Sequence, residues 1–254
     1  MKISINTPSY KRPKVETLQY LPFCKVWVRE EELSEYKAKN PNATFEILQS
    51  KQGNISIVRN EILDREFAAG ADVVCLVDDD LKGIYHFEKS PHNAFGYEKH
   101  LVKADDFHEF IHKHTIMCGE LGFKLWGVNL NKDARSYRHS QPISTASIIL
   151  GPFGCHLKGS KIRYDERIPL KEDYDLAIQH LNEYRGILRM NKFHYDCKQS
   201  VQAGGCASIR NYQTEKEQFG LLVKKWGSNI IRMDKTSKKQ FDYNPIVRIP
   251  IKGV

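Results

Sequence analysis

The chain has 254 residues, enough for one large α/β domain with a substantial core or for two small domains. Its apolar share of 41% and aromatic share of 11% are typical of a folded protein and exclude global disorder. The formal net charge of +8 favours a polyanionic partner without identifying one.

Membrane and secreted proteins are disfavoured by the same sequence. Its apolar runs are too short to span a bilayer, and no signal-peptide pattern opens the chain. The six cysteines are scattered without a CxxC pair. We therefore expect a cytoplasmic protein with reduced thiols and no membrane partner.

The first eighty residues alternate between strand and helix patterns. The run 73–77 lacks polar alternation, as expected of a strand buried on both faces. Such alternation predicts a parallel, doubly wound sheet whose ligands bind at the carboxyl ends of the strands. Strands are expected at residues 3–7, 24–28, 44–48 and 73–77, and helices at 30–39 and 54–69.

The rest of the chain is less regular, and residues 82–103 are expected to form an irregular loop. Its aromatic residues Tyr85, Phe87, Phe95 and Tyr97 either gate a sugar site, stack on an extruded base or simply pack the loop. Helices are expected at 105–121, 173–184 and 214–226, strands at 125–130 and 146–150, and an extended piece at 246–251.

We expect a single α/β domain at residues 1–212, followed by a C-terminal helix and basic extension at 213–254. Within the domain, residues 1–80 and residues 81–212 are expected to form two halves.

Three consecutive carboxylates, Asp78, Asp79 and Asp80, directly follow the buried strand in VCLVDDDL (residues 74–81). A carboxylate cluster at the end of a parallel strand suits Mg²⁺ or Mn²⁺, which takes one or two protein carboxylates and completes its shell with phosphate and water. Taken alone, a solvated acidic turn explains the same residues.

A second acidic stretch, YDERIPLKEDYDL, occupies residues 164–176. It combines an expected strand end at Asp165-Glu166 with a helix start at Glu172-Asp173. Acids at a helix N-terminus are stabilised by the helix dipole, so capping accounts for them. The alternative is that one carboxylate faces a cleft and removes a proton from an acceptor.

The order of four motifs is similar to that of GT-A fold glycosyltransferases of the family-2 type. They are ISINTPSYKRP, NISIVRNEIL, VCLVDDDL and YDERIPLKEDYDL, and the resemblance spans residues 3–180. More narrowly, the chain resembles phage glycosyltransferases associated with TET-type oxygenases, which decorate hydroxymethylated pyrimidines in DNA. The DDDL form and QAGGCASIR (202–210) before a KWG-bearing helix carry this narrower resemblance.

The resemblance implies a GT-A fold, which is a doubly wound mixed α/β sheet flanked by helices, and it assigns roles by matching position. Asp80 would bind Mn²⁺ or Mg²⁺ directly, Asp78 would contact the ribose or the metal shell, and His194 is the candidate for a late histidine ligand. Asp173 is the matching catalytic base, with Glu172 beside it. The resemblance also implies that residues 1–80 form the nucleotide-binding half of the domain and residues 81–212 the acceptor half. The remaining donor-binding positions are Thr7, Pro8, Tyr10, Arg12, Arg59, Asn60 and Asp79.

The implied reaction is metal-dependent transfer of a sugar from a UDP-sugar to the hydroxyl of 5-hydroxymethylcytosine in DNA. One carboxylate on the acceptor side suits a single displacement with inversion. Phosphate contacts are expected from the 82–103 loop and from Lys235, Lys238 and Lys239. A phage-encoded protein of this kind would act in the host cytoplasm.

Other functions remain open at this point. A family-2 enzyme acting on a glycan or protein would share the donor motifs, and a nucleotidyltransferase or a non-catalytic DNA-binding module are remoter alternatives. The sequence HEFIH (108–112) also satisfies the zinc pattern H-E-x-x-H. It lacks the further histidine of the extended protease pattern, which disfavours a metalloprotease.

Overall fold

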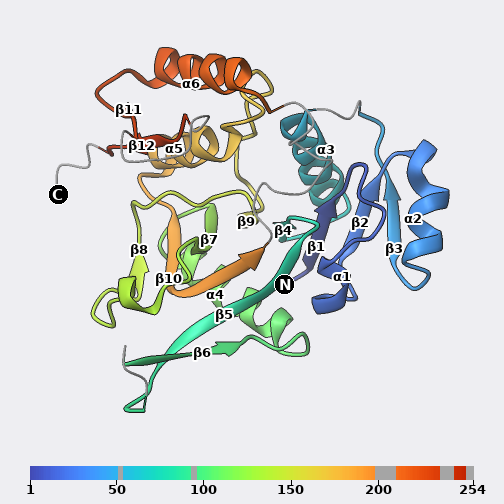
Figure 1. Ribbon diagram of the computed structural model, residues 1–254, viewed down its shortest axis with the longest axis horizontal. Helices are drawn as coiled ribbons and strands as arrows, with labels where there is room; N and C mark the ends of the chain where they lie inside the picture. The colour runs from blue at the N-terminus through green and yellow to red at the C-terminus, as the bar shows by residue number, and fades with distance from the viewer. Residues whose placement is uncertain (51–53, 93–95, 198–209, 235–242, 250–254) are drawn as a thin grey trace.

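The computed structural model describes residues 1–50, 54–92, 96–197, 210–234 and 243–249. Helices and strands alternate along the first part of the chain, as predicted (Figure 1). The elements up to residue 77 are β1 (Ile3–Pro8), α1 (Thr17–Tyr20), β2 (Lys25–Val28), α2 (Leu33–Lys39), β3 (Thr44–Ile47), α3 (Ile55–Ala68) and β4 (Val73–Val77), with a 3₁₀ turn at Glu30–Glu32.

The second part of the chain adds further strands and three longer helices. They are β5 (Leu81–Lys89), β6 (Tyr97–Leu101), α4 (Phe107–Glu120), β7 (Leu125–Asn129), β8 (Ile143–Ser144), β9 (Phe153–Leu157), α5 (Glu172–Tyr184), β10 (Leu188–Cys197), α6 (Tyr212–Trp226), β11 (Ile231–Met233) and β12 (Pro245–Val247), with a 3₁₀ turn at Ala134–Ser136.

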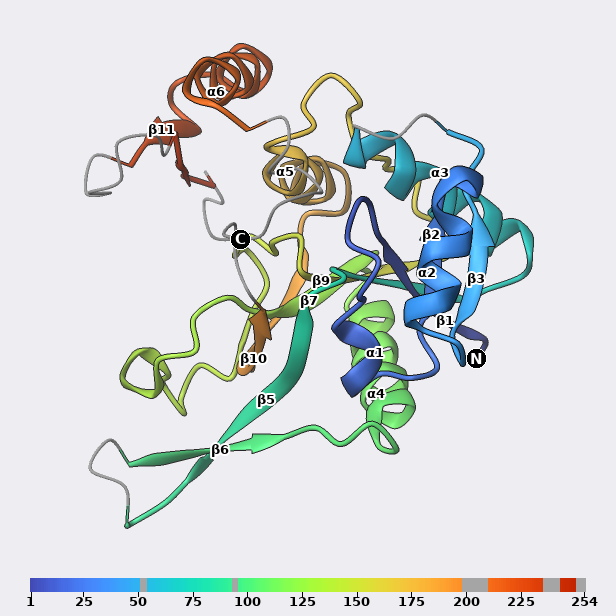
Figure 2. The same ribbon diagram turned by 45° about the vertical axis from the view of Figure 1, so that its right-hand side comes forward.

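The described strands form one large mixed sheet and a separate pair, β11–β12. The ten-stranded sheet has the order β3-β2-β1-β4-β9-β7-β10-β5-β6, with β8 paired to β10. The strands β1 to β4 are parallel, whereas β9 runs antiparallel between β4 and β7. Helices flank this sheet (Figures 1 and 2). The predicted α/β class with a mixed sheet is confirmed. This one sheet contains strands from both predicted halves, residues 1–80 and residues 81–212.

The strand β4 is enclosed on both faces, which explains its unbroken apolar run. Val73, Cys75 and Val77 belong to a core shared with α4. Val74 and Leu76 face the opposite side and belong to a core shared with α3 and α5. Both helix layers therefore fix β4, whose carboxyl end leads directly into the three aspartates.

The prediction of an irregular loop at residues 82–103 was wrong, because this segment forms the β5–β6 hairpin. β6 pairs antiparallel with one edge of β5, and β10 pairs antiparallel with the other. The strand pattern is obscured because both faces of β5 carry apolar residues. Ile84 packs in the α4 core, whereas Phe87 stacks on Tyr137 with ring centroids 5.1 Å apart.

The prediction of a strand at residues 146–150 was also wrong. The strands β9 and β10 were not predicted. The run 146–150 forms no strand, and of its residues Ile149 is buried: it packs against Gly127 of β7, where a Cβ would lie only 2.5 Å from the Ile149 side chain. The predicted strand end at Asp165-Glu166 is likewise irregular. The extended piece predicted at 246–251 overlaps β12.

The predicted C-terminal helix is confirmed as α6. Leu222 of this helix, Ile231 of β11 and Ile178 of α5 share a small apolar core. Figures 1 and 2 show α6 and β11 beyond α5, away from β1 to β3. The C-terminal segment thus packs on the helix that begins with Glu172 and Asp173.

Candidate active site

The aspartate turn, residues 78–80, is fastened to α1 by the side chain and backbone of Thr17. The Thr17 hydroxyl donates to the Asp78 carbonyl (2.6 Å) and accepts from the Leu81 N–H (2.9 Å). The Thr17 N–H donates to the Asp79 carbonyl (3.1 Å). Because Thr17 is fully buried, this turn is held rigidly at the end of β4.

The three carboxylates of the turn have different environments. Asp79 accepts from the Ser9 hydroxyl (2.6 Å) and pairs with Arg12 (2.9 Å). Asp78 pairs with Arg59 (3.0 Å). Among the residues that the structure describes, no side chain donates a hydrogen bond to Asp80. Burial and the charges of its two neighbours raise the pKa of Asp80 to about 7.

This arrangement fits a hard divalent cation. Within the described part of the chain, no cluster of three or more histidine, cysteine, aspartate or glutamate side chains is arranged to hold a metal. Mg²⁺ and Mn²⁺ do not need such a cluster, because one or two carboxylates suffice when phosphate and water complete the shell. Asp80, which forms no salt bridge with any residue that the structure describes, and the partly exposed Asp78 meet that requirement.

Arg59 links the aspartate turn to α5. Its guanidinium pairs with Asp78 (3.0 Å) and with Glu172 (2.8 Å), and it donates to the Gly151 carbonyl (3.3 Å). The group lies 5.5 Å from the centre of the Tyr164 ring, and only 4% of Arg59 is exposed. A Cβ at position 151 would lie 3.0 Å from the guanidinium, so glycine there allows the close approach.

The two acids that begin α5 are held differently. Glu172 pairs with Arg59, whereas Asp173 accepts from the backbone N–H groups of Gly151 (3.1 Å) and Tyr174 (2.8 Å). Burial raises the pKa of both carboxyls, and for Glu172 it outweighs the opposing effect of Arg59. Asp173 is therefore oriented and basic without being neutralised by a salt bridge.

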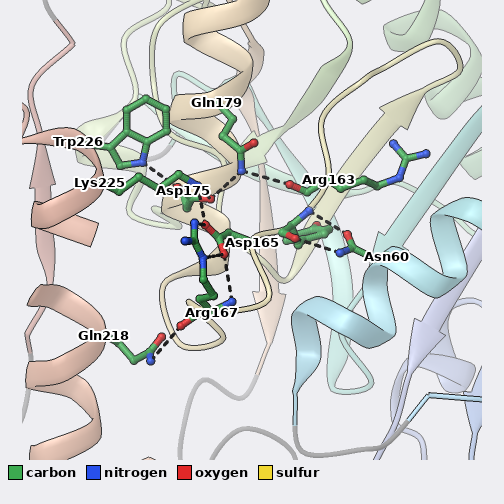
Figure 3. A network of polar contacts seen from close by, with 10 residues as sticks. Asn60, Arg163, Asp165, Arg167, Asp175, Gln179, Gln218, Lys225 and Trp226 are labelled. Carbon is green, nitrogen blue, oxygen red and sulfur yellow. Dashed lines mark hydrogen bonds and ion pairs between the residues drawn. The ribbon is translucent and has the colours of Figure 1, made fainter. Parts of the chain in front are cut away.

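The other predicted donor residues lie beside this turn or behind it. The Thr7 hydroxyl is buried and has no hydrogen-bond partner among the described residues, while Pro8 and Tyr10 are half-buried at the end of β1. Arg12 is engaged with Asp79. Asn60 bonds both backbone groups of Tyr164, at 3.0 and 2.8 Å, and so fastens α3 to the segment before α5 (Figure 3).

The structure does not bring His194 to the aspartates. It lies opposite Tyr85 on β5, whereas Cys197 lies opposite Leu81, the residue that follows the turn. Four residues of strand separate Leu81 from Tyr85, a distance of ~13 Å. The His194 ring contacts Phe87 (4.9 Å between centroids), and burial lowers its pKa to about 4.

The HEFIH segment shows no sign of a zinc site. His108 and His112 are exposed on α4, and Glu109 pairs with Lys113 (2.5 Å) along the helix surface. Several predicted features lie outside the described residues. They are Phe95, Lys235, Lys238, Lys239 and most of the QAGGCASIR segment.

Several residues that hold the site together were not predicted from the sequence. The hydroxyls of Ser9 and Tyr36 contact each other (2.9 Å) beside Asp79, and the Tyr36 hydroxyl also accepts from the Arg12 N–H (3.0 Å). Of these two hydroxyl-bearing residues, Ser9 lies inside a quoted motif, whereas Tyr36 lies in the helix predicted at 30–39. Thr17 and Gly151 lie in segments for which no element was predicted, and no motif marks Thr17, Tyr36 or Gly151.

A mixed α/β sheet with an aspartate turn at the end of a central strand, linked by an arginine to a second acidic site, is the arrangement expected of a GT-A glycosyltransferase. Residues 23–205 match the TET-associated glycosyltransferase family, and the chain belongs to this family. The predicted family and enzyme class are thereby confirmed. No curated protein sequence matches the chain.

Similar solved structures share little sequence with this chain. TarS 1–349 of S. aureus is 15% identical and has a TM-score of 0.47; the match covers 88% of this chain and 66% of that one. The same protein in complex with UDP gives 15% identity, a TM-score of 0.45 and the same coverage. A197 from STIV is 11% identical with a TM-score of 0.40, over 78% of this chain and 86% of that one. The chain thus spans slightly less than two thirds of TarS 1–349.

Each helix in the described ranges is too short or too polar to cross a membrane.

Proposed function

We propose that the protein transfers a sugar, with inversion, from a UDP-sugar to the hydroxyl of 5-hydroxymethylcytosine in DNA, with Mn²⁺ or Mg²⁺ as cofactor. The environment of Asp80 is the observation that carries the donor half of the proposal. This buried carboxylate stands beside two others, and in the described structure it has no cationic partner. A dication would stabilise such a carboxylate and would at the same time bind the diphosphate of a nucleotide-sugar.

At the donor end, Asp80 and Asp78 would hold the metal ion, which supplies charge neutralisation for the leaving diphosphate. Arg12 and Ser9 keep Asp79 turned to the protein, so a single further carboxylate remains for the ion. Thr17 keeps the backbone of the turn fixed while the donor binds.

At the acceptor end, Asp173 would remove the proton from the attacking hydroxyl. The Gly151 and Tyr174 N–H groups orient the carboxylate, and its raised pKa makes it a stronger base than an exposed aspartate. Glu172 would support the base indirectly by holding Arg59. A single base suits direct displacement at the anomeric carbon, which inverts its configuration.

The β5–β6 hairpin is the DNA contact that we propose. It begins at Leu81, directly after Asp80, and projects from the body of the protein (Figures 1 and 2). Lys82, Lys89, Lys99 and Lys103 are exposed along it. A two-stranded ribbon fits the major groove of DNA, the groove into which the hydroxymethyl group of the modified cytosine projects.

The test is direct. The protein is incubated with a panel of UDP-sugars, Mn²⁺ and duplex DNA containing 5-hydroxymethylcytosine, and the digested nucleosides are weighed by mass spectrometry. Unmodified DNA and the Asp80→Ala variant are the controls. A sugar-sized mass gain only with modified DNA and intact Asp80 supports the proposal. Metal-dependent release of UDP without a mass gain on DNA would indicate that the enzyme uses the donor but acts on another acceptor.

The hairpin is tested in the same assay. Lys82→Gln combined with Lys99→Gln should lower transfer to DNA and weaken its dependence on salt, because two phosphate contacts are lost. Lys37→Gln combined with Lys39→Gln removes two exposed lysines from α2, away from the hairpin, and serves as the matched control. Equal effects of the two changes would contradict DNA binding by the hairpin.

A further inference from the structure

Side chains on both sides of Glu172 and Asp173 are bound to α6 and serve as two anchors. Lys171, just before α5, pairs with Glu215 in the first turn of α6 (2.5 Å). Asp175, in the first turn of α5, accepts from Trp226 (2.7 Å) and pairs with Lys225 (2.8 Å) at the other end of α6. Figure 3 shows the side chains of Trp226 and Lys225 reaching Asp175.

Both anchors are buried, which sets them apart from surface ion pairs. Asp175 is fully buried, and the side chains of Lys171 and Glu215 are each 5% exposed. A buried charge is costly unless it is paired and hydrogen-bonded. Asp175 meets this condition because Gln179 also donates to it (2.7 Å), so all its described contacts hold the carboxylate in one position.

The anchors lie one helical turn apart on α5 but at opposite ends of α6. Glu215 and Trp226 are separated by eleven residues, or ~16 Å of helix. Two contacts so far apart on α6 prevent the first turn of α5 from rotating relative to it. No side-chain hydrogen bond caps the start of α5. The apolar core that Ile178 shares with Leu222 lies further along α5, beyond both anchors.

We propose that α6 positions the catalytic turn, with Lys171 and Asp175 acting as positioning residues that hold Asp173 toward the acceptor. This inference rests on the proposed role of Asp173 as the base. Lys225 extends the same clamp to Asp165 (2.8 Å), a residue of the segment that leads into α5. The C-terminal helix, which supplies none of the reacting groups, is therefore required for transfer.

The test uses two mild variants and a matched control in the full-length chain. Trp226→Phe removes one N–H donor and keeps an aromatic ring, and Glu215→Gln removes one charge. Glu217→Gln makes the same change as Glu215→Gln on the exposed side of α6. We expect kcat to fall by about 10- to 100-fold in the first two variants, because small displacements of a base are costly. The KM for the donor should stay unchanged, and the control should behave as wild type.

The pH profile separates positioning from a general loss of structure. Loosening the turn admits water to Asp173 and lowers its pKa, so the acidic limb of the kcat profile should move to lower pH in Trp226→Phe. Unchanged kcat in both variants would overturn the proposal. A fall in kcat accompanied by an equal loss of donor binding and of folded protein would also overturn it.

Hydrogen exchange distinguishes failure of this inference from failure of the proposed function. If the wild type transfers no sugar to any acceptor, the proposed function fails. The amides of residues 173–176 should still exchange faster in Trp226→Phe and Glu215→Gln than in Glu217→Gln. Equal exchange in all three variants would show that α6 does not hold this turn.

Discussion

Asp80→Asn should stabilise the metal-free protein while abolishing transfer. Burial and two adjacent carboxylates raise the pKa of Asp80 to about 7, well above its ordinary value of 3.8. A raised carboxyl pKa means that folding favours the protonated form. The resulting stability is complete below the pKa of the unfolded chain and is lost as the pH rises through about 7.

The magnitude follows from the two pKa values. Ionising Asp80 in the folded protein at pH 8 costs up to ~4 kcal/mol relative to the unfolded chain. Asparagine keeps the shape of the side chain without its charge, so the variant should recover this free energy of unfolding. For a protein of this size the recovery corresponds to a rise in Tm of up to roughly 8–16 °C.

Thermal unfolding at pH 8 in EDTA, repeated at pH 4 and with Mn²⁺ and UDP, measures the effect. The variant should unfold at a higher temperature than wild type at pH 8, with the difference shrinking toward pH 4. Only wild type should gain stability from Mn²⁺ and UDP. Asp105→Asn, which removes an exposed carboxylate before α4, should change nothing. An Asp80→Asn protein no more stable than wild type at pH 8 would refute this reasoning.

Three further substitutions test the rest of the site. Arg59→Met leaves Glu172 buried without its cation and should lower the free energy of unfolding by ~3–5 kcal/mol once Glu172 is ionised. Burial already raises the pKa of Glu172 to about 8, so urea titrations should show a larger loss at pH 9.5 than at pH 6, and an equal loss at both would contradict the pairing. Asp173→Asn should reduce transfer by about 10²- to 10⁴-fold while calorimetry shows unchanged donor binding; persistent transfer would place the base elsewhere. Thr17→Val deprives the aspartate turn of two hydrogen bonds and should destabilise the protein by ~1–3 kcal/mol. It should also weaken binding of UDP with Mn²⁺. Unchanged unfolding and affinity would show that Thr17 does not hold the turn.

The fold was predictable where local patterns match the final burial. Up to β4, every element except the short helix α1 follows from apolar runs and turn residues, and α4, α5 and α6 follow from helical spacing of their apolar residues. The strand β10 was missed because Arg189, Lys192 and Asp196 interrupt its apolar residues and because its pairing shifts register between Met190 and His194. The strand β9 was missed because its five residues include a histidine, His156, whose ring nitrogen is within 3.2 Å of the Tyr164 hydroxyl.

The site was predictable only as far as its motifs reach. The aspartates, Arg59 and the acids of α5 lie in recognisable stretches. Their supports lie far away along the chain: Thr17 is 61 residues from Asp78, and Trp226 is 51 residues from Asp175. Such contacts arise from the packing of α1 and α6 against the sheet and α5, which no local pattern specifies. His194 matched a role in the resembling family but was placed by the sheet register among aromatic rings.

The most direct test of the central claim is the stoichiometry of a single-turnover reaction. Wild-type enzyme in excess over 5-hydroxymethylcytosine sites is mixed with a UDP-sugar and Mn²⁺, and UDP and the sugar-bearing nucleoside are quantified in the same quenched samples. Equal amounts of both should appear together with the wild type, and neither should appear with Asp80→Asn within the same time. UDP that accumulates without a sugar-bearing nucleoside would contradict transfer to DNA.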